Sequence, residues 1–170
     1  QDLEDTVGVA AATLKAPVRH ALGNHDYDVA PGERDGVIKK LGLASGHYSW
    51  QRRGWRFIML NGCAVSLFGH EPGTPGHDEA LGVFNEAQGK LERWNGGLGA
   101  PQREWLAAEL AAARKAGERV ILFCHWPVFP DNKHNLWDTP EVLQIVDAHR
   151  DIVAAWMNGH NHAGNYGEAD

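Results

Sequence analysis

The sequence has few cysteines, no long hydrophobic run and no excess of positive charge. Its two cysteines, Cys63 and Cys124, do not form a CxxC pair. This excludes cysteine-based metal motifs and the disulfide framework of small secreted proteins, and we expect two reduced thiols. No apolar stretch approaches the roughly 18 residues of a membrane span, so membrane insertion of these residues is excluded.

The balance of charge excludes a second class of partner. Sixteen lysines and arginines stand against 22 aspartates and glutamates, and the positive residues are scattered along the sequence. A protein that binds nucleic acid by its charge has a basic patch or stripe. We therefore expect no nucleic-acid partner. We also expect no membrane partner and a cytoplasmic localisation.

Histidine and tryptophan, by contrast, are abundant: the 170 residues include ten and seven of them. Histidine is the commonest metal ligand and the usual acid–base group near neutral pH. The remaining composition, 43% hydrophobic and 22% charged, is that of a globular protein, and the length predicts one domain over residues 1–170. The positions of the histidines are therefore the main clue to function.

Hydrophobic patterns predict alternating helices and strands, which indicates the α/β class. Helices are predicted from apolar periodicity and from Gly, Pro or Thr at their ends over residues 2–15, 32–42, 101–117 and 139–149, with Thr139 as the last N-cap. Strands are predicted over 18–22, 119–125 and 151–158, with a hairpin of 47–50 and 55–61. Residues 64–100, rich in Gly, Pro, Asn and His, are predicted to form a long loop.

Three polar clusters, "ALGNHD", "LFCHWP" and "MNGHNH", each directly follow a predicted strand. Parallel strands would bring them to one edge of a sheet, where α/β proteins bind ligands. Asn24, His125, His160 and His162 then offer one amide oxygen and three imidazoles, which divalent first-row metals accept. In "GHNH" the spacing of two predicts both imidazoles on one side of an extended backbone, each near a different ion of a pair.

Two such ions, about 3.5–4 Å apart, can clamp the attacking and leaving oxygens of a phosphoryl transfer. His25 is adjacent to Asn24 and faces another part of the site, so we predict that it protonates the leaving oxygen, with Asp26 holding its ring. Each cluster taken singly is more often structural, since Asn and Asp favour turns. The three clusters together, each at a strand end, predict a reaction centre.

These motifs resemble the last three motifs of the calcineurin-like metallophosphoesterases. The resemblance covers residues 18–166, and "FNEAQGKLERWNGGLGAPQREWL", "CHWPVFPDNKHNLWDTPEVLQIV" and "NGHNHAGNY" look like the manganese-dependent ADP-ribose/CDP-alcohol diphosphatase branch. It implies a sandwich of two mixed β-sheets flanked by helices. It also implies two divalent metal ions, manganese with iron or zinc as alternatives. By the resemblance, Asn24, His125 and His160 bind one ion, His162 binds the other, and His25 with Asp26 supplies the acid.

The implied activity is metal-dependent hydrolysis of the phosphoanhydride in a small nucleoside diphosphate derivative, such as ADP-ribose or a CDP-alcohol. Two alternatives stay open: another metallophosphoesterase, acting as a phosphodiesterase or phosphomonoesterase, and a non-catalytic scaffold with a degraded metal site. Assays with substrates of each kind distinguish them. The sequence leaves the oligomeric state open.

The sequence departs from the family in its first part. The family's first two motifs, Asp-x-His and Gly-Asp-x-x-Asp/Asn, do not occur before Gly23, and Asp2 and Asp5 follow neither a strand nor a glycine. The resemblance therefore implies an N-terminally truncated chain, which lacks the Asp that bridges the metals in the family. The sequence leaves open whether an upstream segment supplies the missing ligands.

The other histidines and tryptophans give weaker signals. We interpret His20, His47 and His149 as structural and Trp105 as part of the core. His134, Trp137 and residues 95–99 either frame a substrate or form surface loops, and Trp126 is either a wall for a base or a loop anchor.

Overall fold

The computed structural model describes residues 13, 17–164 and 166–168, so the predicted helix over 2–15 lies almost wholly outside the described residues. Its elements follow the order η2 (Asn24–Tyr27), η3 (Arg34–Gly36), α2 (Val37–Lys40), β1 (Tyr48–Arg52), β2 (Trp55–Met59), α3 (Pro75–Glu86), α4 (Gly99–Lys115), β3 (Arg119–Phe123), α5 (Thr139–Asp147) and β4 (Val153–Met157). Among these residues, no helix combines the length and apolar character needed to cross a membrane.

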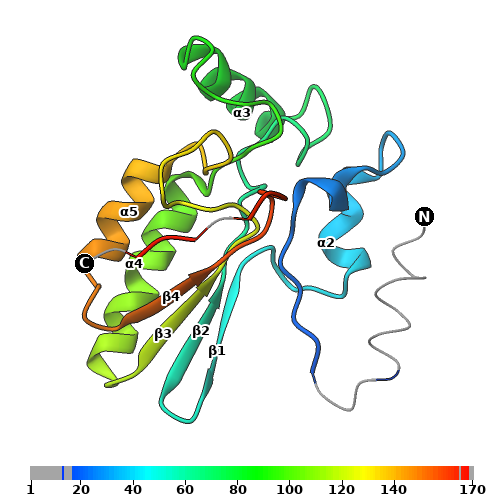
Figure 1. Ribbon diagram of the computed structural model, residues 1–170. Helices are drawn as coiled ribbons and strands as arrows, with labels where there is room; N and C mark the ends of the chain where they lie inside the picture. The colour runs from blue at the N-terminus through cyan, green and yellow to red at the C-terminus, as the bar shows by residue number, and fades with distance from the viewer. Residues whose placement is uncertain (1–12, 14–16, 165, 169–170) are drawn as a thin grey trace.

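One mixed sheet, in the order β1-β2-β3-β4, organises the described part of the chain (Figure 1). Strands β1 and β2 form the predicted hairpin, and the turn between them uses Arg53 at φ 51° and Gly54 at φ 78°. Two consecutive positive φ values are the signature of a turn that matches strand twist. Strands β2, β3 and β4 are parallel to one another. The predicted α/β class is confirmed, and the described residues contain one of the two expected sheets.

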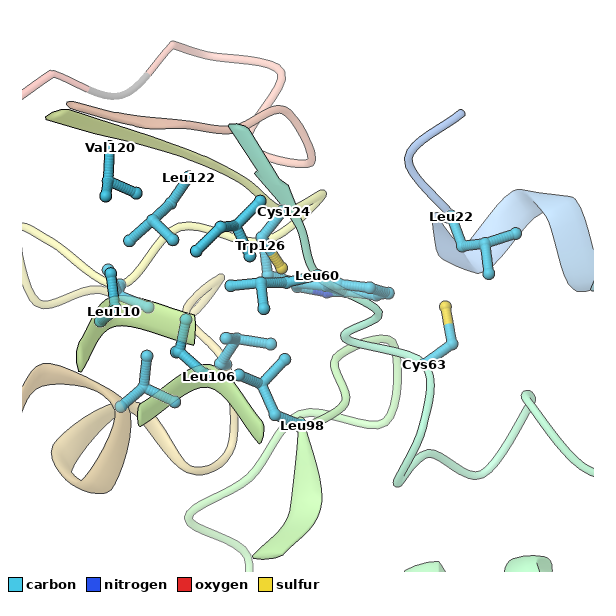
Figure 2. Packing of buried hydrophobic residues seen from close by; sticks show 14 of the residues in the cluster. Leu22, Leu60, Cys63, Leu98, Leu106, Leu110, Val120, Leu122, Cys124 and Trp126 are labelled. Carbon is cyan, nitrogen blue, oxygen red and sulfur yellow. The ribbon is translucent and has the colours of Figure 1, made fainter. Parts of the chain in front are cut away.

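Helices α4 and α5 lie side by side against one face of this sheet (Figure 1). Alternate residues of β3 are buried there, and Figure 2 shows Val120 and Leu122 facing Leu106 and Leu110 of α4. All four side chains are fully buried. Burial of an aliphatic side chain of this size contributes about 1.5–3 kcal/mol, so this layer supplies much of the stability of the sheet.

Hydrogen bonds between the chain segments continue past the ends of the parallel strands. Leu60 N donates to Phe123 O, Cys124 N donates to Met157 O, and Gly159 N donates to His125 O at 3.0 Å. The residues that follow each strand therefore stay in register at the carboxyl edge of the sheet. This pairing places the backbone of His125 beside Gly159, the residue that precedes His160.

A single carboxylate, that of Asp138, joins the first turns of α4 and α5. It accepts hydrogen bonds from Leu98 N and Gly99 N, both at 3.0 Å, and pairs with Arg103. Asp138 is also the residue that precedes α5, so the prediction of Thr139 as N-cap was wrong by one residue. A carboxylate at a helix N-terminus satisfies free N–H groups and the helix dipole, and here it does so for the neighbouring helix.

Two sequence predictions fail for local reasons. Residues 18–22 form no strand, because the Tyr48 hydroxyl takes both backbone groups of His20: it accepts from the N–H and donates to the carbonyl, each at 2.9 Å. The predicted loop over 64–100 contains α3, which begins with Thr74 as N-cap and Pro75 in its first turn. Only Ala80 of that helix is buried, so it lacks the apolar stripe that predicts a helix.

The other predicted elements are confirmed with changed ends. The helix predicted over 32–42 is shorter in the structure and consists of η3 followed by α2. It ends before Gly42, which has φ 69°. The helix predicted over 101–117 is α4 and stops before Gly117, also at φ 69°. Beta-strands β3 and β4 lie within the predicted ranges, and α5 ends at Asp147 rather than at residue 149. The single domain over 1–170 stays a prediction.

We predict that Asp138→Ala destabilises the fold by about 2–4 kcal/mol, because two backbone donors and Arg103 lose a charged acceptor together. Urea unfolding followed by circular dichroism measures this loss. Asp131→Ala, which removes an exposed carboxylate from the preceding loop, is the matched control. Equal stability of the two variants would show that Asp138 does not hold the helices.

Candidate metal site at the carboxyl edge of the sheet

Three potential metal ligands meet beyond the carboxyl ends of β3 and β4. The Nε2 atom of His125 lies 3.1 Å from Asn24 Oδ1 and 3.2 Å from His160 Nδ1. The three side chains are half-buried and come from η2 and from the segments after the two strands. Figure 1 shows the turn after β4 approaching the start of η2. The predicted convergence of Asn24, His125 and His160 is therefore present in the structure.

These distances suit a common metal ion. Adjacent ligand atoms that each lie about 2.1 Å from one ion are separated by roughly 3.0–3.4 Å, for octahedral to tetrahedral angles. The two measured separations fall in this range. One amide oxygen and two imidazole nitrogens form a donor set that zinc, manganese and iron accept. The side chains present thus fit a divalent first-row ion.

Gly23 is required by the space around the ring of His125. A Cβ at Gly23 would lie 2.9 Å from the Cγ atom of that ring, closer than real side chains approach. Its backbone is extended, with φ -123°, so the need is for room and not for an unusual conformation. Gly23 N also donates to Asp26 Oδ2 at 2.7 Å. The glycine lets the ring of one motif pack directly on the backbone of another.

His160 adopts a strained backbone, and the expected extended conformation of "GHNH" is wrong. His160 has φ 62°, and Asn161 N donates to Gly159 O at 2.7 Å across it. A three-residue turn with positive φ at its centre is the rare form of the γ-turn. Because the chain turns here, the imidazoles at 160 and 162 do not share one side of a strand.

The electrostatic surroundings keep the two central imidazoles neutral. The pKa of His160 is lowered to about 4, first by burial and then by the charges of His125, His134, His162 and His25 in that order. Burial also lowers the pKa of His125. A neutral imidazole has the free lone pair that a metal needs. Half of the chain's ten histidines therefore gather within electrostatic range of one point.

The structure places a different carboxylate beside His25 from the one predicted. His25 Nδ1 lies 2.7 Å from Asp28 Oδ2, at an exposed position, whereas the carboxylate of Asp26 accepts from Gly23 N. The short helix η2 turns Asp26 back to its own N-terminus, which places position 28 next to the ring. The predicted contact of Asp26 with His25 is thus corrected to Asp28, for which the sequence suggested no role.

His162 stands apart from the three converging ligands. It is exposed, and its charge lowers the pKa values of His125 and His160. No group of three or more His, Cys, Asp or Glu side chains placed to hold a metal occurs among the residues that the structure describes. The second metal ligand set, predicted around His162, is not assembled by those residues.

Two residues of uncertain role in the sequence lie against His160. Asn95 is 2% exposed, and its Oδ1 lies 2.9 Å from His160 Nε2, while the ring of His134 is 5.5 Å from that of His160. Neither therefore belongs to an ordinary surface loop. Trp126 is fully buried, which excludes it as a wall for a base, and it packs on the rings of His125 and His160 at 4.9 and 5.3 Å.

Comparisons with known proteins agree with this arrangement. The calcineurin-like phosphoesterase family matches residues 2–164. A manganese-dependent ADP-ribose/CDP-alcohol diphosphatase of Xenopus tropicalis is 30% identical over 66% of this chain and 37% of its own length. The protein of the same name from Mus musculus is 23% identical over 91% of this chain and 55% of its own length. The chain thus spans about half the length of such relatives.

A solved structure shows the same fold. The crystal structure of a dimetal phosphatase from Danio rerio superposes with a TM-score of 0.79 at 23% identity. The match covers 93% of this chain and 59% of that one.

We predict that His160 titrates well below the ordinary histidine value, near pH 4, in the metal-free protein. The unfolded chain, with a histidine pKa of 6.5, then binds more protons than the folded protein between these values. Stability is therefore lost as the pH falls from about 6.5 towards 4. NMR titration of the His160 ring protons measures this pKa, and a midpoint at the ordinary value would contradict the burial argument.

Proposed function

Because this chain belongs to the calcineurin-like phosphoesterase family, we propose that it carries the metal site of a metal-dependent phosphohydrolase. The observation that carries the proposal is the position of His125 Nε2, which lies 3.1 Å from Asn24 Oδ1 and 3.2 Å from His160 Nδ1. These atoms come from positions 101 and 35 residues apart, so local turn formation does not account for their meeting.

In this proposal, Asn24, His125 and His160 hold one divalent ion, and His162 belongs to a second. Such an ion, when bound, draws charge from the phosphoryl oxygens and lowers the pKa of water. The neutral state of His125 and His160 favours binding without the prior loss of a proton. The buried ring of Trp126 packs on both imidazoles, with centroids 4.9 and 5.3 Å away, and limits their movement.

His25 is proposed as the general acid, with Asp28 as the residue that orients its ring. The imidazole is exposed at the edge of the ligand group, so its Nε2 is free to reach a bound substrate. Its Nδ1 is engaged by the carboxylate of Asp28 at 2.7 Å, which fixes the orientation of the ring. The position of His25 is supported by its charge acting on both His125 and His160.

The proposed substrates are small nucleoside diphosphate derivatives, such as ADP-ribose or a CDP-alcohol, cleaved at the phosphoanhydride with manganese. This finer assignment follows the names of the relatives, whose identities to this chain are 23–30%. The proposal of manganese rests on the same names and on a donor set that manganese accepts.

We expect the protein to bind Mn²⁺ and to hydrolyse ADP-ribose and CDP-choline in preference to a cyclic nucleotide and p-nitrophenyl phosphate. His125→Ala should weaken Mn²⁺ binding by at least about 100-fold, because even outer-shell partners are worth 10- to 100-fold. Isothermal titration calorimetry measures the affinity. His149→Ala is the matched control, because His149 is half-buried and bonds Ile145 O at the far end of α5.

The pattern of results distinguishes the alternatives. Hydrolysis without preference for the diphosphate compounds would indicate another kind of phosphoesterase. Absence of Mn²⁺ binding and of all hydrolysis would favour the scaffold.

A separate prediction concerns His25. His25→Ala should lower kcat by about two to four orders of magnitude, the range of general acid catalysis, and leave Mn²⁺ affinity unchanged. Asp28→Asn should lower kcat less than His25→Ala, and Asp26→Ala should act on stability through the lost contact with Gly23 N. Steady-state kinetics and calorimetry on the three variants measure these effects. A loss of Mn²⁺ binding in His25→Ala would reassign His25 as a ligand.

A further inference from the structure

We propose that Asn95 is a positioning residue that fixes the tautomer and the orientation of His160, so that His160 Nδ1 is the atom presented to the metal. The inference rests on the proposed function for the metal itself, but its structural content concerns the metal-free protein. Asn95 lies 65 residues before His160, in the segment between α3 and α4.

All of the hydrogen-bonding groups of the Asn95 side chain have assigned partners. Asn95 Nδ2 donates to Lys133 O at 2.8 Å and to Asn135 O at 3.0 Å, which uses both of its hydrogens. Two carbonyl oxygens can accept hydrogen bonds only from the NH₂ end of the amide, so these partners determine the orientation of the Asn95 side chain. Oδ1 is then the atom that faces His160 Nε2 at 2.9 Å.

This contact determines which ring nitrogen of His160 carries the proton. An amide oxygen only accepts hydrogen bonds, so His160 Nε2 must donate. A neutral imidazole has a single ring proton, which leaves Nδ1 with its lone pair. That nitrogen is the one 3.2 Å from His125 Nε2, inside the group of proposed ligands. Asn95 therefore selects the tautomer that the metal requires.

Asn95 also restrains the direction of the ring. His160 is half-buried and sits at the centre of a strained turn with φ 62°. Packing against Trp126 and His134 is edgewise or tilted, with ring centroids at 5.3 and 5.5 Å, and does not distinguish a ring from its flipped form. The hydrogen bond to Oδ1 does, because a flipped ring would place carbon against the oxygen.

The support of Asn95 is itself firm. Asn95 N donates to Glu92 O, and in the next residues Trp137 N donates to Gly96 O at 2.8 Å while Gly97 pairs with Val65. The side chain is 2% exposed, so water does not compete for its contacts. Outer-shell groups of this kind, which donate to or accept from the second nitrogen of a ligand histidine, are worth about 10- to 100-fold in metal affinity.

The first test uses the unaltered protein without metal. Long-range ¹H–¹⁵N NMR spectra distinguish a protonated from an unprotonated ring nitrogen. We expect His160 to carry its proton on Nε2 above pH 6. A proton on Nδ1 would overturn the inference directly, and this measurement needs neither a variant nor bound metal.

The second test compares variants. In Asn95→Ala we expect His160 to populate both tautomers and Mn²⁺ affinity to fall by about 10- to 100-fold. Asn95→Asp keeps an acceptor for Nε2 and should restore the Nε2–H tautomer even if the loop at 133–135 loosens. Asn135→Ala is the matched control: its side chain is also buried and bonds Pro130 O, but does not touch His160. The control should keep both the tautomer and the affinity.

The outcomes separate the two proposals. An Nε2–H tautomer that persists in Asn95→Ala, or an Mn²⁺ affinity that falls equally in Asn95→Ala and Asn135→Ala, would overturn the role of Asn95. If Asn95→Ala does not fold, the tautomer of the unaltered protein and of Asn95→Asp decides the question. Failure of the unaltered protein to bind Mn²⁺ would count against the proposed function, and the tautomer would still test Asn95.

Discussion

The segment Asn95–Gly99 is held between three other parts of the chain, and the geometry of the site depends on it. A Cβ on Gly96 would lie 2.3 Å from Gly62 O, and one on Gly97 would lie 2.9 Å from the carboxylate of Asp138. The two glycines thus allow a close approach that no side chain would permit. Asn95 at one end of the segment bonds His160, and Gly99 at the other end begins α4 under the carboxylate of Asp138. Helix α4 and His160 thus share one support.

The parallel sheet brings side chains that are distant in the sequence to one edge. Each of β2, β3 and β4 ends at the same edge, and the backbone pairing that continues beyond β3 and β4 keeps His125 and Gly159 in contact. Apolar burial in the layer between β3 and α4 supplies the stability, while the polar groups at the edge add direction. Polar side chains can therefore lie at the half-exposed edge without weakening the core, because replacing them removes little buried apolar surface.

Sequence reasoning predicts which side chains meet better than it predicts the local backbone. The approach of Asn24, His125 and His160 is predicted from their residue types and from their places after apolar runs, and the structure confirms that they meet. The partner of His25 and the course of the chain through "GHNH" are not predictable in this way, because they depend on the turn of η2 and on the positive φ at His160. The strand expected over 18–22 fails because a side chain 28 residues away, Tyr48, replaces a neighbouring strand. Long-range contacts of single side chains leave no periodic signal.

The positive φ of His160 also implies a trade between stability and the proposed site. A non-glycine residue held in the left-handed region costs about 1 kcal/mol or more, which glycine at the same place would not. Glycine at position 160 would therefore stabilise the turn and remove an imidazole from the group that also contains Asn24 and His125. Stabilising changes commonly cost activity where they fall in a functional site, so at position 160 the demands of the fold and of the proposed metal site oppose each other.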